Sequence, residues 1–311
     1  MAVVDAVTGR ILDADSRVDS GADTAADMSR RLDLMDSSGV DRALLFPAGP
    51  LETDGGSAES GLTKLKAHND WCADIAKISS RLRPVAVIDT DSITDAIAEA
   101  ERVIDAGVRA VCVPAGIPPG GISPGHPDVD PLWQVFASSG VPIVLRAESR
   151  LNMFRSLTWD VEGDGAELFS LAQGHVMAKN YLTPMVYGGV FDRHPDLMVG
   201  CVQMGAGWIG PMAENLDGVA KNWFSKTLSK TLSLRPSQYI ERNVRVTCAA
   251  WEPVHTYFER YGLDDVYIYG SSIVSPTDDV DPANQYTDLP QQLGPTLTEK
   301  FFATNASGLM P

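Results

Sequence analysis

Short apolar runs alternate with longer amphipathic segments along the whole chain. The apolar runs are rich in β-branched residues, and nearly every position in them is apolar, which is typical of strands covered on both faces. The strands predicted in this way are residues 2–6, 42–46, 84–88, 110–114, 142–147, 198–203, 244–248 and 266–269.

The segments between these runs repeat their apolar residues at the period of an α-helix. The predicted helices are residues 24–38, 63–78, 93–106, 131–139, 166–191, 209–223, 253–261 and 297–309. Several of them end at a glycine that directly precedes a strand, as at Gly39, Gly107 and Gly140. A glycine at this position adopts the left-handed conformation that ends many helices.

Eight alternating strand–helix units predict an α/β fold, and specifically a single (β/α)₈ TIM-type barrel with long loops at the C-terminal face. An open, doubly wound sheet is the alternative, although such sheets usually have fewer strands. No change in composition marks a domain boundary, so we expect residues 1–311 to form one domain.

The charge balance narrows the range of partners. The chain of 311 residues has 25 Lys and Arg against 41 Asp and Glu, a net charge of −16. A protein with this much negative charge repels nucleic acids and anionic membranes. There is no apolar stretch of membrane-spanning length and no basic start typical of a secretory signal. The cysteines are scattered, which favours the reducing cytoplasm over a disulfide framework; they are Cys72, Cys112, Cys201 and Cys248.

Four stretches carry more specific motifs: SPGHP at residues 123–127, GGVFDRHPDL at 188–197, QMGAGW at 203–208 and YGS at 269–271. Together they resemble the amidohydrolase-2 branch of the amidohydrolase superfamily, which contains aminocarboxymuconate-semialdehyde and resorcylate decarboxylases. The resemblance covers nearly the whole chain. It implies a distorted (β/α)₈ barrel with a divalent metal at its mouth, and often a homodimer.

The positions that this resemblance assigns to metal ligands carry other residues here. The D-x-H-x-H pattern expected at the end of the first strand is missing after Asp5. Arg146 stands in place of the strand-five histidine and Gln203 in place of the strand-six ligand. Ser272 and Ser275 stand where an aspartate and a histidine are usual. Arginine repels a cation, and serine and glutamine are weak neutral ligands, so we expect neither a metal nor a cofactor.

Arg146 is the most informative of these residues, because a guanidinium inside a barrel is costly unless it is paired. It could replace the positive charge of the metal by binding a substrate carboxylate or by stabilising an oxyanion. Arg146 could instead form an ion pair with Glu148 or Asp5 that fills an inactive site. Glu148 follows on the same strand face, as a counter-ion or as a general base.

The other candidates follow the predicted strand ends. We expect catalytic roles for Arg146, Glu148, His175 and Gln203, with His175 as an acid or base and Gln203 as a donor to an oxyanion. The predicted substrate-binding residues are Asp5, Trp208, Trp251, Ser272 and Ser275.

The first hypothesis for function is a metal-independent enzyme that acts on a small organic acid or cyclic metabolite by acid–base chemistry. Decarboxylation, dehydration, cyclisation and hydrolysis all remain open. The second is a non-catalytic barrel that binds a metabolite or supports an active paralogous subunit. The third is a metal-dependent hydrolase or decarboxylase with ligands that the pattern does not reveal. The expected assembly is a homodimer or a pairing with a paralogue.

Overall fold

Eight parallel strands form the centre of the molecule in a computed structural model, which describes residues 2–5, 24–37, 39–46, 58–116, 118–146, 172–223, 232–270 and 286–311. Their order in the sheet follows their order in the sequence. The strands are β1 (Ala2–Asp5), β2 (Arg42–Leu45), β3 (Leu82–Val87), β4 (Ala110–Cys112), β5 (Ile143–Arg146), β6 (Val199–Val202), β7 (Val244–Thr247) and β8 (Tyr267–Ile268).

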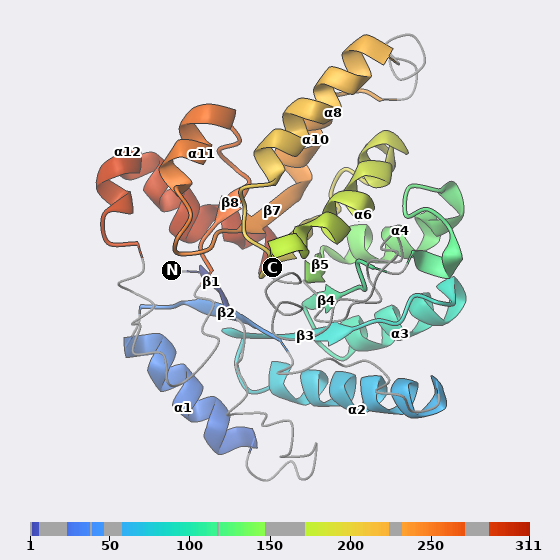
Figure 1. Ribbon diagram of the computed structural model, residues 1–311. Helices are drawn as coiled ribbons and strands as arrows, with labels where there is room; N and C mark the ends of the chain where they lie inside the picture. Colours follow the sequence, from blue (N-terminus) through green and yellow to red (C-terminus); the bar gives the residue numbers. More distant parts are fainter. Residues whose placement is uncertain are drawn as a thin grey trace, which may run out of the picture.

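Helices surround this sheet on the outside (Figure 1). They are α1 (Thr24–Ser37), α2 (Ala58–Ala76), α3 (Ile93–Asp105), α4 (Asp130–Ser139), α6 (His175–Tyr187), α7 (Val190–Arg193), α8 (Ile209–Trp223), α10 (Pro236–Asn243), α11 (Val254–Tyr261) and α12 (Leu289–Glu299). Within the described ranges, none of the helices combines the length and apolarity that crossing a bilayer requires.

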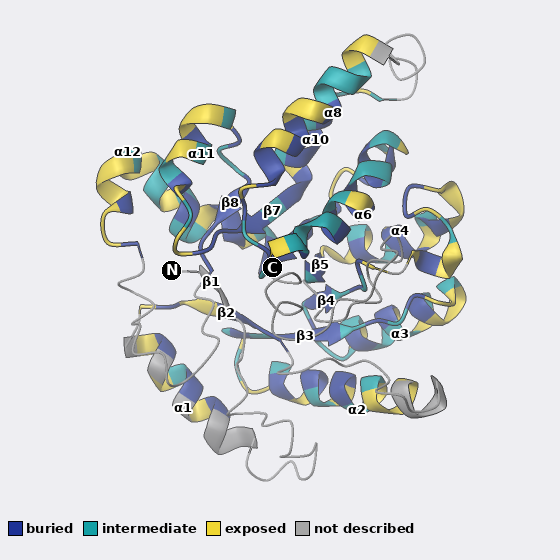
Figure 2. Cartoon of the chain, in the orientation of Figure 1, coloured by how far each residue is buried: buried dark blue, intermediate teal, exposed yellow. Residues whose placement is uncertain are grey.

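Strands β2 to β8 are largely apolar because each of their two faces packs against a different core. On β2 and just after it, Leu44 and Phe46 point into the barrel, whereas Ala43 and Leu45 pack against the helices. Strands β2 to β8 are accordingly mostly buried, while the outer helix faces are exposed (Figure 2). This double burial explains the continuous apolar runs, since a strand with one wet face would alternate.

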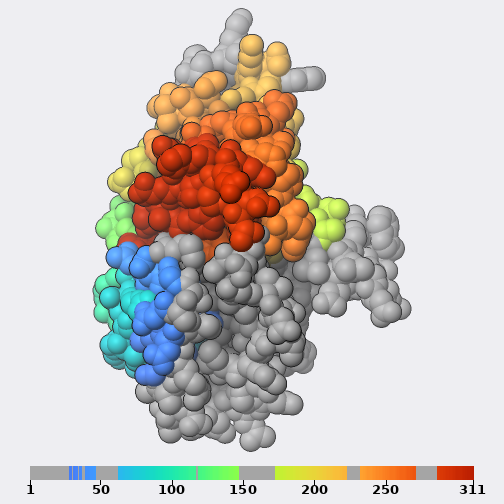
Figure 3. Space-filling view, turned by 90° about the vertical axis from the view of Figure 1, so that its left-hand side faces the viewer, coloured from blue at the N-terminus to red at the C-terminus, as the bar shows by residue number. Residues whose placement is uncertain are grey.

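The C-terminal segment packs against both ends of the sheet. The π-helical turn η5 (Lys300–Thr304) contacts both β1 and β8, and Tyr269 N donates to Phe301 O at 2.9 Å. The following 3₁₀ turn η6 (Asn305–Leu309) buries Leu309 in the inner core. Figure 3 shows these C-terminal residues, in red, next to N-terminal elements in blue.

The structure confirms the predicted barrel and all eight strands, each displaced by no more than a few residues at its ends. The doubly wound alternative is wrong, because the strand order runs from β1 to β8 without the reversal that defines that fold. The helix predicted over residues 209–223 coincides with α8.

Two helix predictions need correction, and one helix was missed. The described part of residues 166–191 is interrupted near Gly188, where a Cβ would lie 2.5 Å from the Gly125 oxygen; Gly189, at φ +72°, then starts α7. The predicted helix 297–309 is instead the end of α12 followed by η5 and η6, which turn the chain into the barrel. Helix α10 was not predicted, because its eight residues are mostly polar and too few to show a period.

Candidate active site at the barrel mouth

Arg146 is the last residue of β5 and lies on its inner face. It is two residues after Val144, which belongs to the inner core, so alternation brings its side chain to the same side. The guanidinium carbon lies 6.0 Å from the centre of the Phe46 ring, which follows β2. A cation over an aromatic face is favourable, and more so away from water. Arg146 therefore brings a positive charge into the barrel near its C-terminal mouth.

Gln203 follows β6 with a left-handed backbone. Its φ is +60°, and among the described residues no other non-glycine has a positive φ. Its N–H donates to Thr247 Oγ1 at the end of β7, at 3.1 Å. Such a backbone costs roughly 1–3 kcal/mol, and residues of this kind concentrate at functional sites. The turn that carries Gln203 is thus held in place by the neighbouring strand.

His175 and Trp208 meet at the same end of the barrel. Their rings stack with centroids 6.1 Å apart and planes at 19°, although His175 starts α6 and Trp208 follows β6. The Trp208 indole N–H donates to Gly205 O at 2.8 Å. Burial, with a smaller effect from the nearby positive charge of Lys179, lowers the pKa of His175 from its usual 6.5. His175 is therefore neutral at pH 7 and able to accept a proton.

Glu252 is a residue that the sequence analysis did not select. Its carboxylate accepts hydrogen bonds from the N–H groups of Ala206, Gly207 and Ala249, at 2.6–3.0 Å. It thereby ties the loop after β7 to the turn after β6. In the sequence it is one acid among many, and only the pairing of β6 with β7 brings its partners together.

Of the remaining predicted residues, Trp251 and Asp5 lie in the described part of the chain. Trp251 follows β7 and 86% of it is exposed, so its proposed contact with substrate stays a prediction. The backbone of Asp5 pairs in register with Leu45. Glu148, Ser272 and Ser275 lie outside the described residues. The structure therefore brings Arg146, Gln203, His175 and Trp208 to the mouth.

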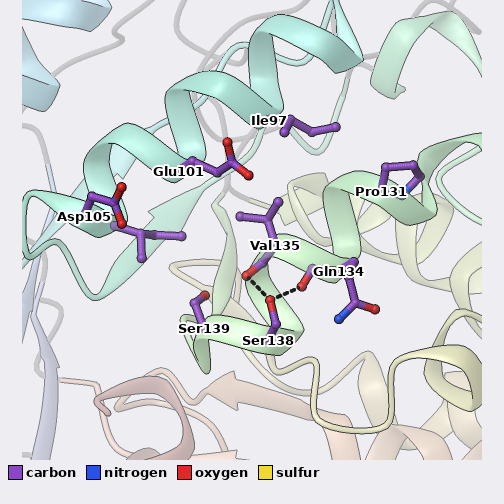
Figure 4. A pocket seen from close by; sticks show the side chains of 9 residues that line it. Ile97, Glu101, Asp105, Pro131, Gln134, Val135, Ser138 and Ser139 are labelled. Atoms are coloured by element: carbon purple, nitrogen blue, oxygen red, sulfur yellow. Dashed lines mark hydrogen bonds between the residues drawn. The ribbon is translucent and has the colours of Figure 1, made fainter.

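A groove on the outside of the barrel is a separate feature. It lies between α3 and α4, where Ile97, Ile104 and Val135 form its apolar part and Glu101 and Asp105 lie along α3 (Figure 4). The Ser138 hydroxyl donates back to Gln134 O at 2.7 Å, as in many helix-surface serines. The Ser139 hydroxyl likewise donates to Phe136 O at 3.2 Å, and no Lys, Arg or His lines this groove, so we do not assign the chemistry to it.

The described part of the mouth does not fit a divalent cation. Among the described residues, no three His, Cys, Asp or Glu side chains form a group that could hold a metal ion. At the ends of β5 and β6 stand instead a guanidinium and a neutral amide, Arg146 and Gln203. A guanidinium repels a cation, and an amide is a weak ligand.

A family model described as Amidohydrolase matches residues 14–309. No curated protein matched the sequence. Several solved structures are similar in fold. An amidohydrolase from Mycobacterium avium subsp. paratuberculosis K-10 is 20% identical with a TM-score of 0.74, and the match covers 91% of this chain and 74% of that one.

Decarboxylases are among the similar structures. The 2,6-dihydroxybenzoate decarboxylase from Rhizobium is 18% identical with a TM-score of 0.66, over 100% of this chain and 99% of that one. A variant 5-carboxyvanillate decarboxylase from Novosphingobium aromaticivorans DSM 12444, with bound manganese, is 17% identical with a TM-score of 0.65, over 99% and 96%. At these identities the likeness is one of fold.

Proposed function

This chain belongs to the amidohydrolase family, and from that premise we propose that it is a decarboxylase or hydrolase that acts on a small carboxylate-bearing or cyclic substrate without a metal. The observation that carries the proposal is Arg146, whose positive charge lies inside the barrel over Phe46 at the mouth. Decarboxylases among the similar structures support the reaction type. We also propose that the protein is a homodimer in the cytoplasm and that residues 1–311 form a single domain.

For decarboxylation, the bond between the substrate carbon and its carboxylate breaks, and the electron pair stays on the carbon. A proton then replaces the carboxylate there, and CO₂ leaves. Arg146 binds the carboxylate in the ground state or stabilises the negative charge that develops elsewhere on the substrate. His175, which is neutral at pH 7, or Glu148 takes up a proton from solvent and passes it to the carbon, and Gln203 donates to an oxygen of the substrate.

The two roles of Arg146 predict different kinetics. An anchor for the carboxylate acts on the ground state, so Arg146→Met would mainly raise KM. A group that stabilises developing charge acts in the transition state, so the same substitution would mainly lower kcat, by about a hundredfold or more. Arg260→Met is the matched control, because Arg260 is an exposed arginine paired with Glu214 on the helical surface.

The test is the consumption of 2,6-dihydroxybenzoate and 5-carboxyvanillate by purified protein, followed together with its metal content by mass spectrometry. We expect turnover with far less than one metal per chain, and its loss in Arg146→Met but not in Arg260→Met. Stoichiometric metal that is required for turnover would contradict metal independence. Binding of these acids without turnover would favour the non-catalytic alternative.

A further inference from the structure

A single carboxylate joins two loops at the mouth of the barrel. Glu252 Oε1 accepts from Ala206 N at 2.9 Å and Gly207 N at 2.8 Å, and Oε2 accepts from Ala249 N at 2.6 Å. The Tyr257 hydroxyl adds a donor at 3.3 Å. Hydrogen bonds from N–H groups to a carboxylate are among the strong ones in proteins. Glu252 therefore fixes the turn after β6, residues 203–208, to the loop after β7.

The turn is shaped to receive this carboxylate. Gly205 has φ +65°, and a Cβ there would lie 3.1 Å from Glu252 Oε1. A Cβ on Gly207 would lie 2.7 Å from the Tyr257 hydroxyl oxygen. The two glycines thus let the backbone approach Glu252 and Tyr257 closely. The turn also leads into α8, whose amino end favours a negative charge.

The same turn carries the side chains that we place at the active site. Gln203 begins it in a left-handed conformation, and Trp208 ends it stacked on His175. Ala206 and Gly207, the two residues that Glu252 holds, lie between them. A shift of these amides would therefore move both Gln203 and Trp208.

We propose that Glu252 is a positioning residue of the active site, which sets the places of Gln203 and Trp208 without contacting the substrate. The proposal rests on the function proposed above for this mouth. This role differs from that of an acid that only stabilises the fold, because the loss of Glu252 would change substrate binding and the environment of His175 while leaving the barrel folded.

Glu252→Gln tests the proposal with almost no change in shape. The amide presents an N–H₂ group where the carboxylate had an oxygen, so at least one backbone N–H then faces another donor. Glu259→Gln is the matched control, since Glu259 is an exposed glutamate on α11, the helix that follows Glu252. Glu252→Asp restores the charge on a shorter side chain and measures partial rescue.

The first readout needs no substrate. We expect Glu252→Gln to speed amide hydrogen exchange in residues 203–208 by about tenfold or more, with exchange in β3 unchanged. In NMR titrations the pKa of His175, assigned with a His175→Gln variant, should move toward 6.5 as Trp208 leaves the stack. Glu259→Gln should change neither, and Glu252→Asp should lie between.

The second readout uses 2,6-dihydroxybenzoate as the probe. KM or Kd should rise about tenfold in Glu252→Gln, with a smaller change in kcat. Unchanged exchange in residues 203–208, or faster exchange with an unchanged His175 pKa, would overturn the proposal. If the wild-type protein neither binds nor converts the probe, the function proposed above fails, and the exchange and NMR results still decide the role of Glu252.

Discussion

The two ends of the barrel use arginine in opposite ways. At the N-terminal end, Arg42, Arg83 and Arg245 donate to the backbone oxygens of Met310, Pro311 and Asn305 at 2.7, 2.8 and 3.0 Å. At the C-terminal mouth, Arg146 lies over the ring of Phe46. The first three arginines bind backbone acceptors in residues 305–311, whereas Arg146 lies over an aromatic ring at the end of the barrel where we place the substrate.

The comparison shows where this fold gains stability and where it accepts strain. The N-terminal end is filled by Leu309, which is fully buried and packs so closely on Gly200 that a Cβ there would lie 2.8 Å away. The mouth holds the left-handed Gln203 and the partly buried His175. Substitutions at the closed end should therefore affect folding, and those at the mouth should affect activity.

The largest effect is expected from Leu309→Ala. Removing a fully buried leucine that leaves a cavity costs about 2–5 kcal/mol of unfolding free energy, measurable by urea denaturation. Leu62→Ala is the control, because Leu62 is 53% exposed and its loss should cost less than about 0.5 kcal/mol. Equal losses in the two variants would show that the C-terminal segment does not stabilise the barrel.

A pair of arginine substitutions compares the two ends directly. Arg245→Met leaves several backbone carbonyls without a donor and should cost about 1–3 kcal/mol of stability, with KM unchanged below the unfolding temperature. Arg146→Met should change stability by less than about 1 kcal/mol and reduce activity. Urea denaturation and kinetics on both variants give the answer, and the reverse pattern would contradict the comparison.

A smaller effect is expected from pH. Burial lowers the folded-state pKa of His68, and it also lowers that of His175. Because the unfolded chain then takes up protons more readily, stability is fully present above about pH 6.5 and falls as the pH drops toward the lowered values. Urea midpoints measured from pH 8 to 5 check this. Protonation of His175 at low pH should also lower kcat, and His175→Gln should remove this pH dependence of kcat. The contribution of His68 to the pH dependence of stability should stay the same in that variant.

The smallest effect is expected from Gln203→Gly. Glycine adopts a φ of +60° without the strain of a side chain, but it loses more entropy on folding. The net gain should be at most about 1 kcal/mol. Activity should fall, because the amide that we place at the substrate is removed. A loss of stability in urea denaturation would show that the Gln203 side chain stabilises the turn more than its backbone strains it.

Local patterns predicted the fold well because the barrel repeats one simple unit. Runs such as residues 142–147 identified β5, and the period over residues 209–223 identified all of α8. The prediction of a helix over residues 297–309 was wrong because the end of the chain enters the barrel, which depends on a contact of Leu309 with distant strands. The short α10 has too few apolar residues for any local pattern.

The candidate site was predicted only in part. The strand-end position of Arg146 was enough to place it in the barrel, and the structure adds its contact with Phe46, 100 residues earlier in the chain. The catalytic roles assigned to Arg146, Glu148, His175 and Gln203 stay predictions, as does the absence of a metal. Glu252 was missed because two of its N–H donors, Ala206 and Gly207, lie over 40 residues before it, in the turn after another strand.

The sequence by itself determined the secondary structure and the class of fold, because the alternation of apolar runs and amphipathic segments is a local property that eight parallel units repeat. Only the tertiary structure decided which polar side chains meet. The stacking of His175 on Trp208, the hydrogen bond from Gln203 N to Thr247 and those from Ala206 and Gly207 to Glu252 all join separate elements. Such contacts depend on strand register and loop closure, which no stretch of residues encodes alone.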